Sequence, residues 1–417
     1  MFSYMNPGVA TMAVGHLDAD CFYVSAERVR DRFLEGKPVG VLGNQGACVI
    51  AKSYEMKREG VKTGEPIWDA MAKCPDGIYV KRDFRWYHAL SLMMLEAVRE
   101  ASRRVEYYSI DEFYFRAERG RGETFAGLAR GLRDRIRDRV GVPATVGIAR
   151  TRTLAKLAAD ASKPAGARAV LTAADEEELL DGLPVTEIAG IAGRRAARLA
   201  AWGITTCLHL ARADRALVRR LLTASGEALW WEINGTPVQP IHERRPAHKT
   251  LSRGGSLGGA TTDPRILYAW LVRNLERLIE ELRYHRVAAG RLTVLVAYKN
   301  DRTGQGRATL AVPADRFDLL LDVARPCLRR AWAEGETATH MPLIAEDLAP
   351  RGQASLPFFD PPGRRGLAEA VDRLKEEVNG RIGRFALRSG ATLYLPAIYR
   401  DSANDFDICD IRGKVCF

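Results

Sequence analysis

The heptapeptide YYSIDEF, residues 107–113, places two adjacent carboxylates among aromatic and apolar residues. The surrounding stretch RVEYYSIDEFYFRAE (104–118) is rich in aromatic residues and predicts one buried strand. Burying a carboxylate is unfavourable unless a cation or hydrogen-bond donors compensate its charge. Asp111 and Glu112 therefore indicate a rigid cation site, although this pair taken alone also fits a solvent-facing position.

A second acidic pair follows another predicted strand. The stretch TMAVGHLDAD (11–20) begins apolar, and an amphipathic helix is expected from about Cys21. Asp18 and Asp20 lie two positions apart and project to the same face of a strand, although DAD alone also fits a loop or a helix N-cap. If the two strands are neighbours, four carboxylates converge and repel one another unless cations are present. Such oxygen ligands suit Mg²⁺, and two ions about 4 Å apart can activate a hydroxyl and stabilise a leaving pyrophosphate.

Alternating strands and helices set the expectation for the fold of the N-terminal part. Short strands are expected within 38–43, 47–53 and 143–149, and long amphipathic helices at 84–102 and 124–141. The apolar face of the first helix comprises Leu90, Met94, Leu95 and Val98. This order predicts an α+β sheet with helices on one face, related to a split βαβ unit.

The chain changes character after about residue 181. Short helices interrupted by glycine predict a small helical domain, and PVQPIHERRPAHKT (237–250) predicts a basic, proline-rich linker. Strands and helices alternate again over 248–346 and predict a second α/β unit. The remainder, 347–417, contains one predicted helix at 365–383.

Composition narrows the class of protein. The 417 residues suggest about three domains or more, and the formal net charge of +11 favours a polyanionic partner such as nucleic acid, while also fitting an ordinary basic enzyme. Seven widely spaced cysteines without a CxxC pair support neither a disulfide framework nor a zinc site, and favour a reducing cytoplasm. No apolar run is long enough to span a membrane, so no membrane partner is expected.

Five segments, taken in order, resemble the Y-family DNA polymerases, the translesion enzymes that include bacterial DNA polymerases IV and V. They are DADCFYVSAE (18–27), AKSYEMKREGVKTGEPI (51–67), YYSIDEFYF (107–115), GIARTRTLAKLAADASKPAG (147–166) and LPVTEIAGIAGRRAARLAAWGI (183–204). The resemblance is strong over 12–245 and looser over 246–346, and the C-terminal part is more similar to the polymerase V catalytic subunit.

The resemblance implies an α+β, multidomain, right-hand polymerase with a ferredoxin-like palm, small fingers, a helical thumb with a helix-hairpin-helix, and an α/β little finger. The implied boundaries are 12–30 and 83–180 for the palm, 31–82 for the fingers, 181–239 for the thumb, 240–247 for a linker, 248–346 for the little finger and 347–417 for a C-terminal tail.

Roles for individual residues follow from the resemblance. Asp18, Asp111 and Glu112 match the catalytic carboxylates that hold two Mg²⁺ ions, with Ala19 and Asp20 beside the metals. Tyr23 matches the steric gate that excludes a 2′-hydroxyl from the sugar site. The implied nucleotide-binding residues are Cys21, Phe22, Tyr23, Tyr54, Lys57 and Lys163.

Contacts with DNA and a sliding clamp are implied further along the chain. Gly190 and Gly193 belong to the hairpin, whose backbone N–H groups suit a DNA phosphate, and Arg244, Arg245, Lys249 and Arg253 are candidates for backbone contacts. QASLPFF (353–359) resembles the short bacterial clamp-binding peptide. Its anchors would be Gln353, Leu356 and Phe358.

The sequence departs from the family pattern at several positions. Phe113 replaces a small residue, Arg152-Thr153 replaces Asn-Lys, Lys57 replaces an arginine, and Ala192 replaces the hairpin glycine. None of these changes removes a metal ligand, so they put nucleotide preference and fidelity in doubt and leave the reaction class intact.

The function expected from these features is template-directed, low-fidelity DNA synthesis past lesions, with primer–template DNA, dNTP, a sliding clamp and an accessory subunit of the polymerase V type as partners. Two alternatives stay open. A nucleotide cyclase shares the palm and a GGDEF-like strand, but lacks the fingers motif, the hairpin and a basic C-terminal half. A catalytically weak accessory DNA-binding subunit keeps the fold, and the intact Asp18, Asp111 and Glu112 argue against it.

Overall fold

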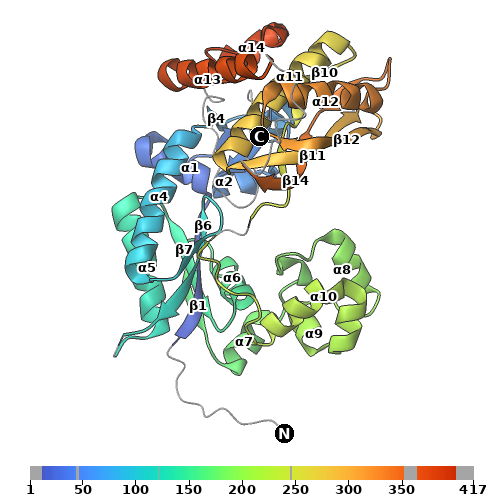
Figure 1. The fold of residues 1–417 in the computed structure, drawn as a ribbon. Coiled ribbons are helices and arrows are strands. Elements are labelled where there is room, and N and C mark those ends of the chain that lie inside the picture. The colour runs from blue at the N-terminus through green and yellow to red at the C-terminus, as the bar shows by residue number, and fades with distance from the viewer. Residues whose placement is uncertain (1–11, 44–46, 121, 245–246, 352–363, 401–417) are drawn as a thin grey trace.

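The computed structural model describes residues 12–43, 47–120, 122–244, 247–351 and 364–400. Within them the chain forms a palm, fingers, a thumb and a little finger, with a helical C-terminal segment on the last of these (Figure 1). No helix in the described part of the chain combines the length and apolarity needed to cross a membrane.

The palm is built on a five-stranded sheet in the order β5-β6-β1-β7-β8. Strand β1 is central and pairs antiparallel with β6 and β7, while β7 and β8 run parallel. The palm strands are β1 (Met12–Ala19), β5 (Val105–Tyr107), β6 (Glu112–Glu118), β7 (Ala144–Ala149) and β8 (Ala167–Val170).

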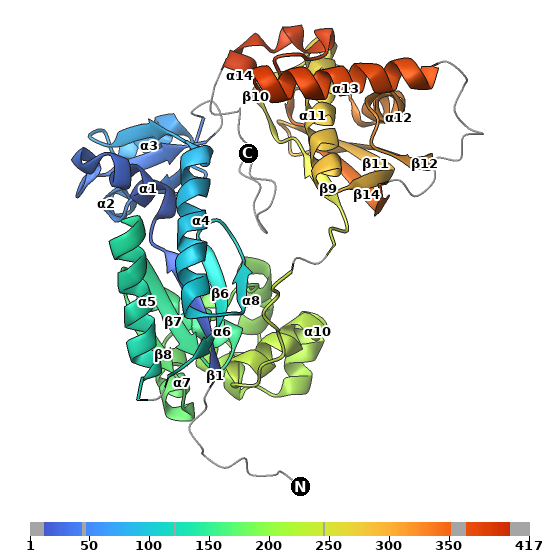
Figure 2. The same ribbon diagram turned by 60° about the vertical axis from the view of Figure 1, so that its left-hand side comes forward.

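Helices cover both faces of the palm sheet, so the expectation of helices on a single face was wrong. Helices α4 (Phe84–Ala101) and α5 (Phe125–Val140) lie on one face, and α6 (Arg152–Asp160) lies on the other (Figures 1 and 2). The four apolar residues expected on one face of α4 are all buried. On the opposite face Gly147 admits α6, because a Cβ there would lie 2.2 Å from the carbonyl oxygen of Ala155.

The fingers are a small unit between β1 and α4. Helix α1 (Phe22–Arg30) leads from β1 into a three-stranded sheet in the order β3-β2-β4. Its elements are β2 (Val39–Leu42), β3 (Val49–Lys52), α2 (Tyr54–Arg58), α3 (Ile67–Lys73) and β4 (Ile78–Lys81).

The thumb is helical and shares its core with α6 of the palm. Its helices are α8 (Gly193–Ala200), α9 (Cys207–Arg212) and α10 (Arg215–Ile233), and α7 (Ala173–Leu180) precedes them in the chain. The linker leaves α10 and reaches the little finger at β9 (Leu251–Arg253).

The little finger has six strands, with β11 (Val287–Tyr298) at its centre and α11 (Pro264–Tyr284) and α12 (Phe317–Ala331) packed into one core with it. Strand β14 continues to Pro350, four residues past the boundary expected from the sequence. The remaining strands are β10 (Ser256–Thr261), β12 (Thr303–Ala314), β13 (Ala338–His340) and β14 (Leu343–Pro350).

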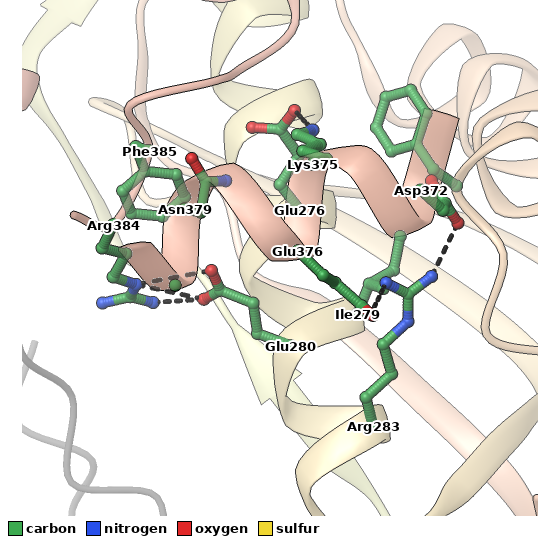
Figure 3. Close-up of a pocket in the computed structure, with 12 residues that line it drawn as sticks. Glu276, Ile279, Glu280, Arg283, Asp372, Lys375, Glu376, Asn379, Arg384 and Phe385 are labelled. Carbon is green, nitrogen blue, oxygen red and sulfur yellow. Dashed lines mark hydrogen bonds and ion pairs between the residues drawn. The ribbon is translucent and has the colours of Figure 1, made fainter. Parts of the chain in front are cut away.

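The predicted C-terminal helix is present as α13 (Arg364–Ile382), followed by α14 (Pro396–Arg400). Helix α13 lies along α11 and is attached to it by ion pairs (Figure 3). Arg283 of α11 contacts Asp372 at 2.6 Å and also pairs with Glu376, and Lys375 pairs with Glu276. A cavity of about 320 Å³ beside these pairs is lined by residues of both helices. All its lining residues lie far along the chain from the palm carboxylates.

Candidate active site

Three carboxylates gather where β1 and β6 begin their antiparallel pairing. Asp18 stands directly opposite Glu112 in the register of the two strands. The backbone N–H of Ala19 donates to the Asp111 carbonyl oxygen at 2.9 Å, which holds Asp111 beside the end of β1. Main-chain pairing therefore brings Asp18, Asp111 and Glu112 together from positions more than 90 residues apart.

The acidic pair lies at a hairpin turn, so the expectation of one continuous strand over 104–118 was wrong. Strands β5 and β6 pair with each other, and residues 108–111 form the turn between them. The N–H groups of Tyr108 and Ser109 donate to the Glu112 carbonyl oxygen at 3.1 and 3.0 Å. The Ser109 hydroxyl accepts from the Glu112 N–H at 3.0 Å and donates to Asp111. A serine side chain that bonds nearby backbone favours a turn over a ladder, and this turn presents both carboxylates at the end of the sheet.

Two lysines neutralise the cluster from the α6 side of the sheet. The Lys156 ammonium contacts Glu112 Oε1 at 2.6 Å and lies 3.9 Å from Asp18, and Lys163 donates to Asp18 Oδ2 at 2.8 Å. Both lysines also pair with Asp160. Lys156 is not among the site residues expected from the sequence. Its signal was a lysine on the otherwise apolar face of the helix ARTRTLAKLAAD, four residues before an aspartate.

Burial shifts the pKa values of this cluster strongly. Burial raises the pKa of Asp18 to about 8; the Lys163 ammonium opposes that shift, while Glu112 and Asp111 add to it. Burial also raises the pKa of Asp111. Burial alone would lower the pKa of Lys163, but the neighbouring Asp18 and Asp160 more than offset it, so its pKa is raised. The site therefore favours bound cations and keeps the lysines charged.

The donor set fits a divalent metal ion. Ligand atoms of His16, Asp18 and Glu112 all lie within 4.8 Å of one another. His16 is fully buried, neither of its ring nitrogens has a hydrogen-bond partner, and burial lowers its pKa so that it stays neutral. Carboxylate oxygens are the ligands that Mg²⁺ prefers. The sequence analysis did not select His16, which lies two positions before Asp18 on the same strand face.

Asp20 has hydrogen-bond partners of a different kind. Its carboxylate accepts from the Thr145 hydroxyl at 3.0 Å and from the Ala165 N–H at 2.6 Å, and the residue is almost fully buried. These bonds attach the end of β1 to the loop that carries Lys163. A metal contact by Asp20 or by the backbone of Ala19 stays a prediction.

Three of the residues expected to meet the nucleotide lie at the turn from β1 into α1. Cys21 has a left-handed backbone, with φ 47°, and this turn joins β1 to α1 directly. Phe22 is buried in the palm core. The next residue, Tyr23, is partly exposed and its ring stacks on Tyr87 with 4.7 Å between the centroids.

The fingers bring a second aromatic group and an exposed cation to this region. Tyr54, the first residue of α2, lies near Asp20, and burial beside this carboxylate raises the pKa of Tyr54. Lys57 lies one turn later on α2 and is exposed. The fold thus places Tyr54 and Lys163 next to the carboxylates, while Lys57 remains at the surface of the fingers.

Comparison with known proteins agrees with this geometry. A family model described as the impB/mucB/samB family matches residues 17–160, and the model of its C-terminal domain matches residues 248–358. The chain belongs to the impB/mucB/samB family. DNA polymerase IV 1 of Bacillus subtilis (strain 168) is 30% identical over 387 residues, covering 91% of this chain and 92% of that protein. Protein UmuC of Salmonella typhimurium is 28% identical, covering 89% of this chain and 91% of that protein.

Solved structures show the same fold. A Y-family DNA polymerase chimera, Dbh-Dpo4(243-245)-Dbh, superposes with a TM-score of 0.69 at 22% identity, covering 81% of this chain and all of that one. A structure titled as an insertion ternary complex of Dbh DNA polymerase superposes with a TM-score of 0.52 at 22% identity, covering 80% of this chain and 98% of that one. The right-hand architecture expected from the sequence is therefore confirmed.

The family hairpin of the thumb is formed by Gly190 to Gly193. Gly190 has φ 98°, a conformation that favours glycine, and Gly193 is the first residue of α8. Ala192 replaces a family glycine at no conformational cost, because its φ of −101° and ψ of −179° are open to any residue. The backbone geometry of the hairpin therefore survives this departure.

The predicted DNA contacts of the linker and little finger have different surroundings. Arg244 and Lys249 are exposed. Arg253 is only 3% exposed and pairs with the buried Glu281 of α11, so its assignment as a DNA contact was wrong. Its ion pair attaches β9 to α11, and a phosphate at the surface cannot reach it. Arg245 and the clamp-binding anchors Gln353, Leu356 and Phe358 lie outside the described residues.

The departure at Phe113 is accommodated inside the palm. The ring is fully buried and stacks on Tyr107, with 5.4 Å between centroids and 6° between planes. Phe113 points to the α4 face, opposite to its neighbour Glu112, because successive strand residues alternate. The extra bulk therefore fills the core and does not enter the carboxylate site.

Proposed function

We propose that this chain is a template-directed, low-fidelity DNA polymerase that extends a primer 3′-hydroxyl with dNTP opposite damaged template in DNA damage tolerance. One observation carries the proposal: Asp18, Asp111 and Glu112 converge at one end of the palm sheet, with Tyr54 of the fingers near Asp18. The names of the relatives and the Y-family fold support it.

The carboxylates and Lys163 are proposed to have different roles in nucleotidyl transfer. Asp18, Asp111 and Glu112 would hold two Mg²⁺ ions, which supply charge neutralisation and activation of the primer hydroxyl when bound. Lys163 is placed to exchange its contact with Asp18 for the triphosphate, whose negative charge it would offset. In the transfer the primer oxygen bonds to the α-phosphorus, its proton leaves, and the bond to pyrophosphate breaks.

Tyr23 is proposed to act as the steric gate. Its ring is held by stacking on Tyr87 and by Phe84 at 5.7 Å between centroids, so it cannot easily move aside for a 2′-hydroxyl. Gly190 and Gly193 of the thumb, with Arg244, Arg245 and Lys249, are proposed to contact DNA phosphates, a mode that tolerates any sequence.

The test is primer extension by the full chain with Mg²⁺ on undamaged and abasic templates, with Asp111→Ala as the inactive control. Extension that is lost in the control supports the proposal, and extension past the abasic site supports lesion bypass. If the wild-type chain binds primer–template but extends neither template, the chain is the alternative, an accessory DNA-binding subunit.

The proposal also includes two partners, a sliding clamp and an accessory subunit of the polymerase V type. It further includes a site of action, cytoplasmic DNA at the nucleoid. The clamp assignment rests on the peptide QASLPFF. Clamp binding measured on the wild-type chain and on Phe358→Ala tests it, and equal affinity of the two proteins would refute it.

A further inference from the structure

Two buried carboxylates bind the first part of the linker through its backbone. Glu232, near the end of α10, is fully buried and accepts from the N–H groups of Val238 at 2.8 Å and Gln239 at 2.9 Å. Glu106 of β5 is 2% exposed and accepts from the His242 N–H at 2.8 Å. Three of the five residues in 238–242 therefore donate their backbone N–H to a buried carboxylate.

Arg152 completes this attachment from the N-terminus of α6. Its guanidinium donates to Glu106 Oε2 at 2.5 Å and to the Pro240 carbonyl oxygen at 2.8 Å. The same guanidinium lies over the Tyr114 ring, 3.9 Å from the centroid. A planar, always charged fork can satisfy a carboxylate, a carbonyl and an aromatic face together.

The attachment continues into the helix that carries the active-site lysine. Glu232 accepts from the Thr153 N–H at 3.1 Å, and its carbonyl oxygen accepts from the Thr151 hydroxyl at 2.8 Å. One turn further along α6, Lys156 contacts Glu112. Linker, thumb and catalytic strand thus meet at α6, around a cavity of about 560 Å³ between palm, thumb and linker.

We infer that Glu106, Arg152 and Glu232 are positioning residues that anchor linker residues 238–242 to the palm and thereby set the reach of the little finger. The inference rests on the proposed function, since that function requires the little finger to hold duplex DNA. With the anchor, only residues 243–250 separate the palm from β9. Without it, the separating segment begins at 235, just after α10, and doubles from eight to sixteen residues.

The length of this segment predicts the size of the effect. The effective concentration of a tethered domain falls roughly as the −3/2 power of tether length, so doubling the tether lowers it about threefold. Loss of the anchor should therefore raise the Kd for primer–template about threefold. Turnover at saturating DNA should stay within about twofold, because the catalytic carboxylates are untouched.

His242→Pro is the sharpest variant, because it removes the N–H that Glu106 accepts and alters no palm residue. His242→Ala is its matched control, because it keeps that N–H. A second variant, the triple substitution Glu106→Leu, Arg152→Met and Glu232→Leu, removes every carboxylate that accepts from the linker amides and avoids leaving the buried Arg152 charge unpaired. Thermal melting shows whether each variant is folded.

Hydrogen–deuterium exchange of the full chain reads the anchor directly, without any need for polymerase activity. The amides of 238, 239 and 242 should be protected in the wild type and in His242→Ala, and all three should exchange faster in the triple variant. In His242→Pro the amides of Val238 and Gln239 should stay protected, because they keep their bonds to Glu232. Fluorescence anisotropy should then show the threefold rise in Kd for the triple variant. His242→Pro should raise Kd only about 1.4-fold, because Arg152 still holds Pro240 and the tether lengthens from eight residues (243–250) to ten (241–250).

Two results would overturn the inference. One is exchange of 238–242 in the wild type at the rate of an unstructured peptide. The other is unchanged DNA affinity in folded variants whose 238–242 amides have lost protection. Failure of the wild type to extend a primer would instead count against the proposed function, and the exchange data would still decide whether the anchor exists.

Discussion

Asp18 and Glu112 face each other across the β1–β6 ladder, and the single ammonium of Lys156 lies 2.6 Å from Glu112 and 3.9 Å from Asp18. The protein itself therefore supplies positive charge to a site whose carboxylates repel one another. Residues that bind metal and substrate therefore differ in role from residues that only hold the strands together. Substitutions can distinguish the two groups.

Glu112→Gln should lower the rate of primer extension about 10³-fold, because it keeps the shape of the side chain and removes the charge that binds metal. Circular dichroism should show an unchanged fold. Glu118→Gln is the matched control, since it alters an exposed carboxylate at the far end of the same strand. An extension rate for Glu112→Gln above a tenth of wild type would refute its assignment as a catalytic ligand.

Tyr23→Ala should increase incorporation of ribonucleotides relative to deoxyribonucleotides by roughly 10- to 100-fold, because the ring that blocks the 2′-hydroxyl is gone. Tyr23→Phe keeps the ring and its stacking on Tyr87, so it should retain discrimination. The ratio of kcat/KM for a matched rNTP and dNTP measures the effect. Equal discrimination by Tyr23→Ala and the wild type would exclude Tyr23 as the gate.

Stability without metal should fall as pH rises, because the pKa of Asp18 is raised to about 8 in the folded chain. An unfolded aspartate titrates near 3.9, so between about pH 4 and pH 8 the folded chain binds more protons than the unfolded one. Stability therefore decreases across that window, and Mg²⁺ should restore it most at the alkaline end, where the carboxylate is charged. Melting temperatures with Mg²⁺ and with chelator at pH 6 and 8.5 test this.

Asp18→Asn is the control for the pH effect. Its melting temperature in chelator should change less between pH 6 and pH 8.5 than that of the wild type. A stabilisation by Mg²⁺ that is equal at the two pH values in the wild-type chain would contradict the assignment of this titration to the metal site.

Gly15→Ala should destabilise the palm by about 1–3 kcal/mol through overpacking. A Cβ at Gly15 would lie only 2.1 Å from the ring of Phe115, its cross-strand neighbour on β6. Phe115→Leu in the same chain should recover part of the loss, and urea unfolding measures both. Gly131→Ala is the opposite case, because it lies exposed in α5 with no atom near its Cβ position, and it should stabilise by up to about 1 kcal/mol.

Much of the palm could be predicted from the sequence because its signals are local. Periodicity placed α4 and α5 to within a residue or two, and the apolar start of TMAVGHLDAD identified β1. The hairpin at 108–111 was missed because it depends on the hydrogen bonds of the Ser109 hydroxyl with Glu112 and Asp111, which the sequence alone does not reveal.

The carboxylates of the candidate site could be predicted from the sequence. The residues that lie against these carboxylates were harder to predict. Asp18, Asp111 and Glu112 stood out because acids are rare beside apolar strands. His16 and Lys156 did not, because a buried histidine or a lysine on a helix usually has a purely structural explanation. Arg253 was misassigned because an arginine in a basic stretch gives no sign that it forms a buried ion pair with Glu281.

The sequence by itself determined the long palm helices, the family resemblance and the candidate catalytic carboxylates, because helix periodicity and short motifs depend on residues close together in the chain. Only the tertiary structure decided that Asp18 opposes Glu112, that Lys156 and Lys163 neutralise them, and that Glu106, Arg152 and Glu232 hold the linker. Most of these contacts join residues that lie 40 to 145 positions apart in the sequence. The register of the strands and the packing of α6 determine which residues meet. Charge pairing at such separations depends on geometry that no local pattern encodes.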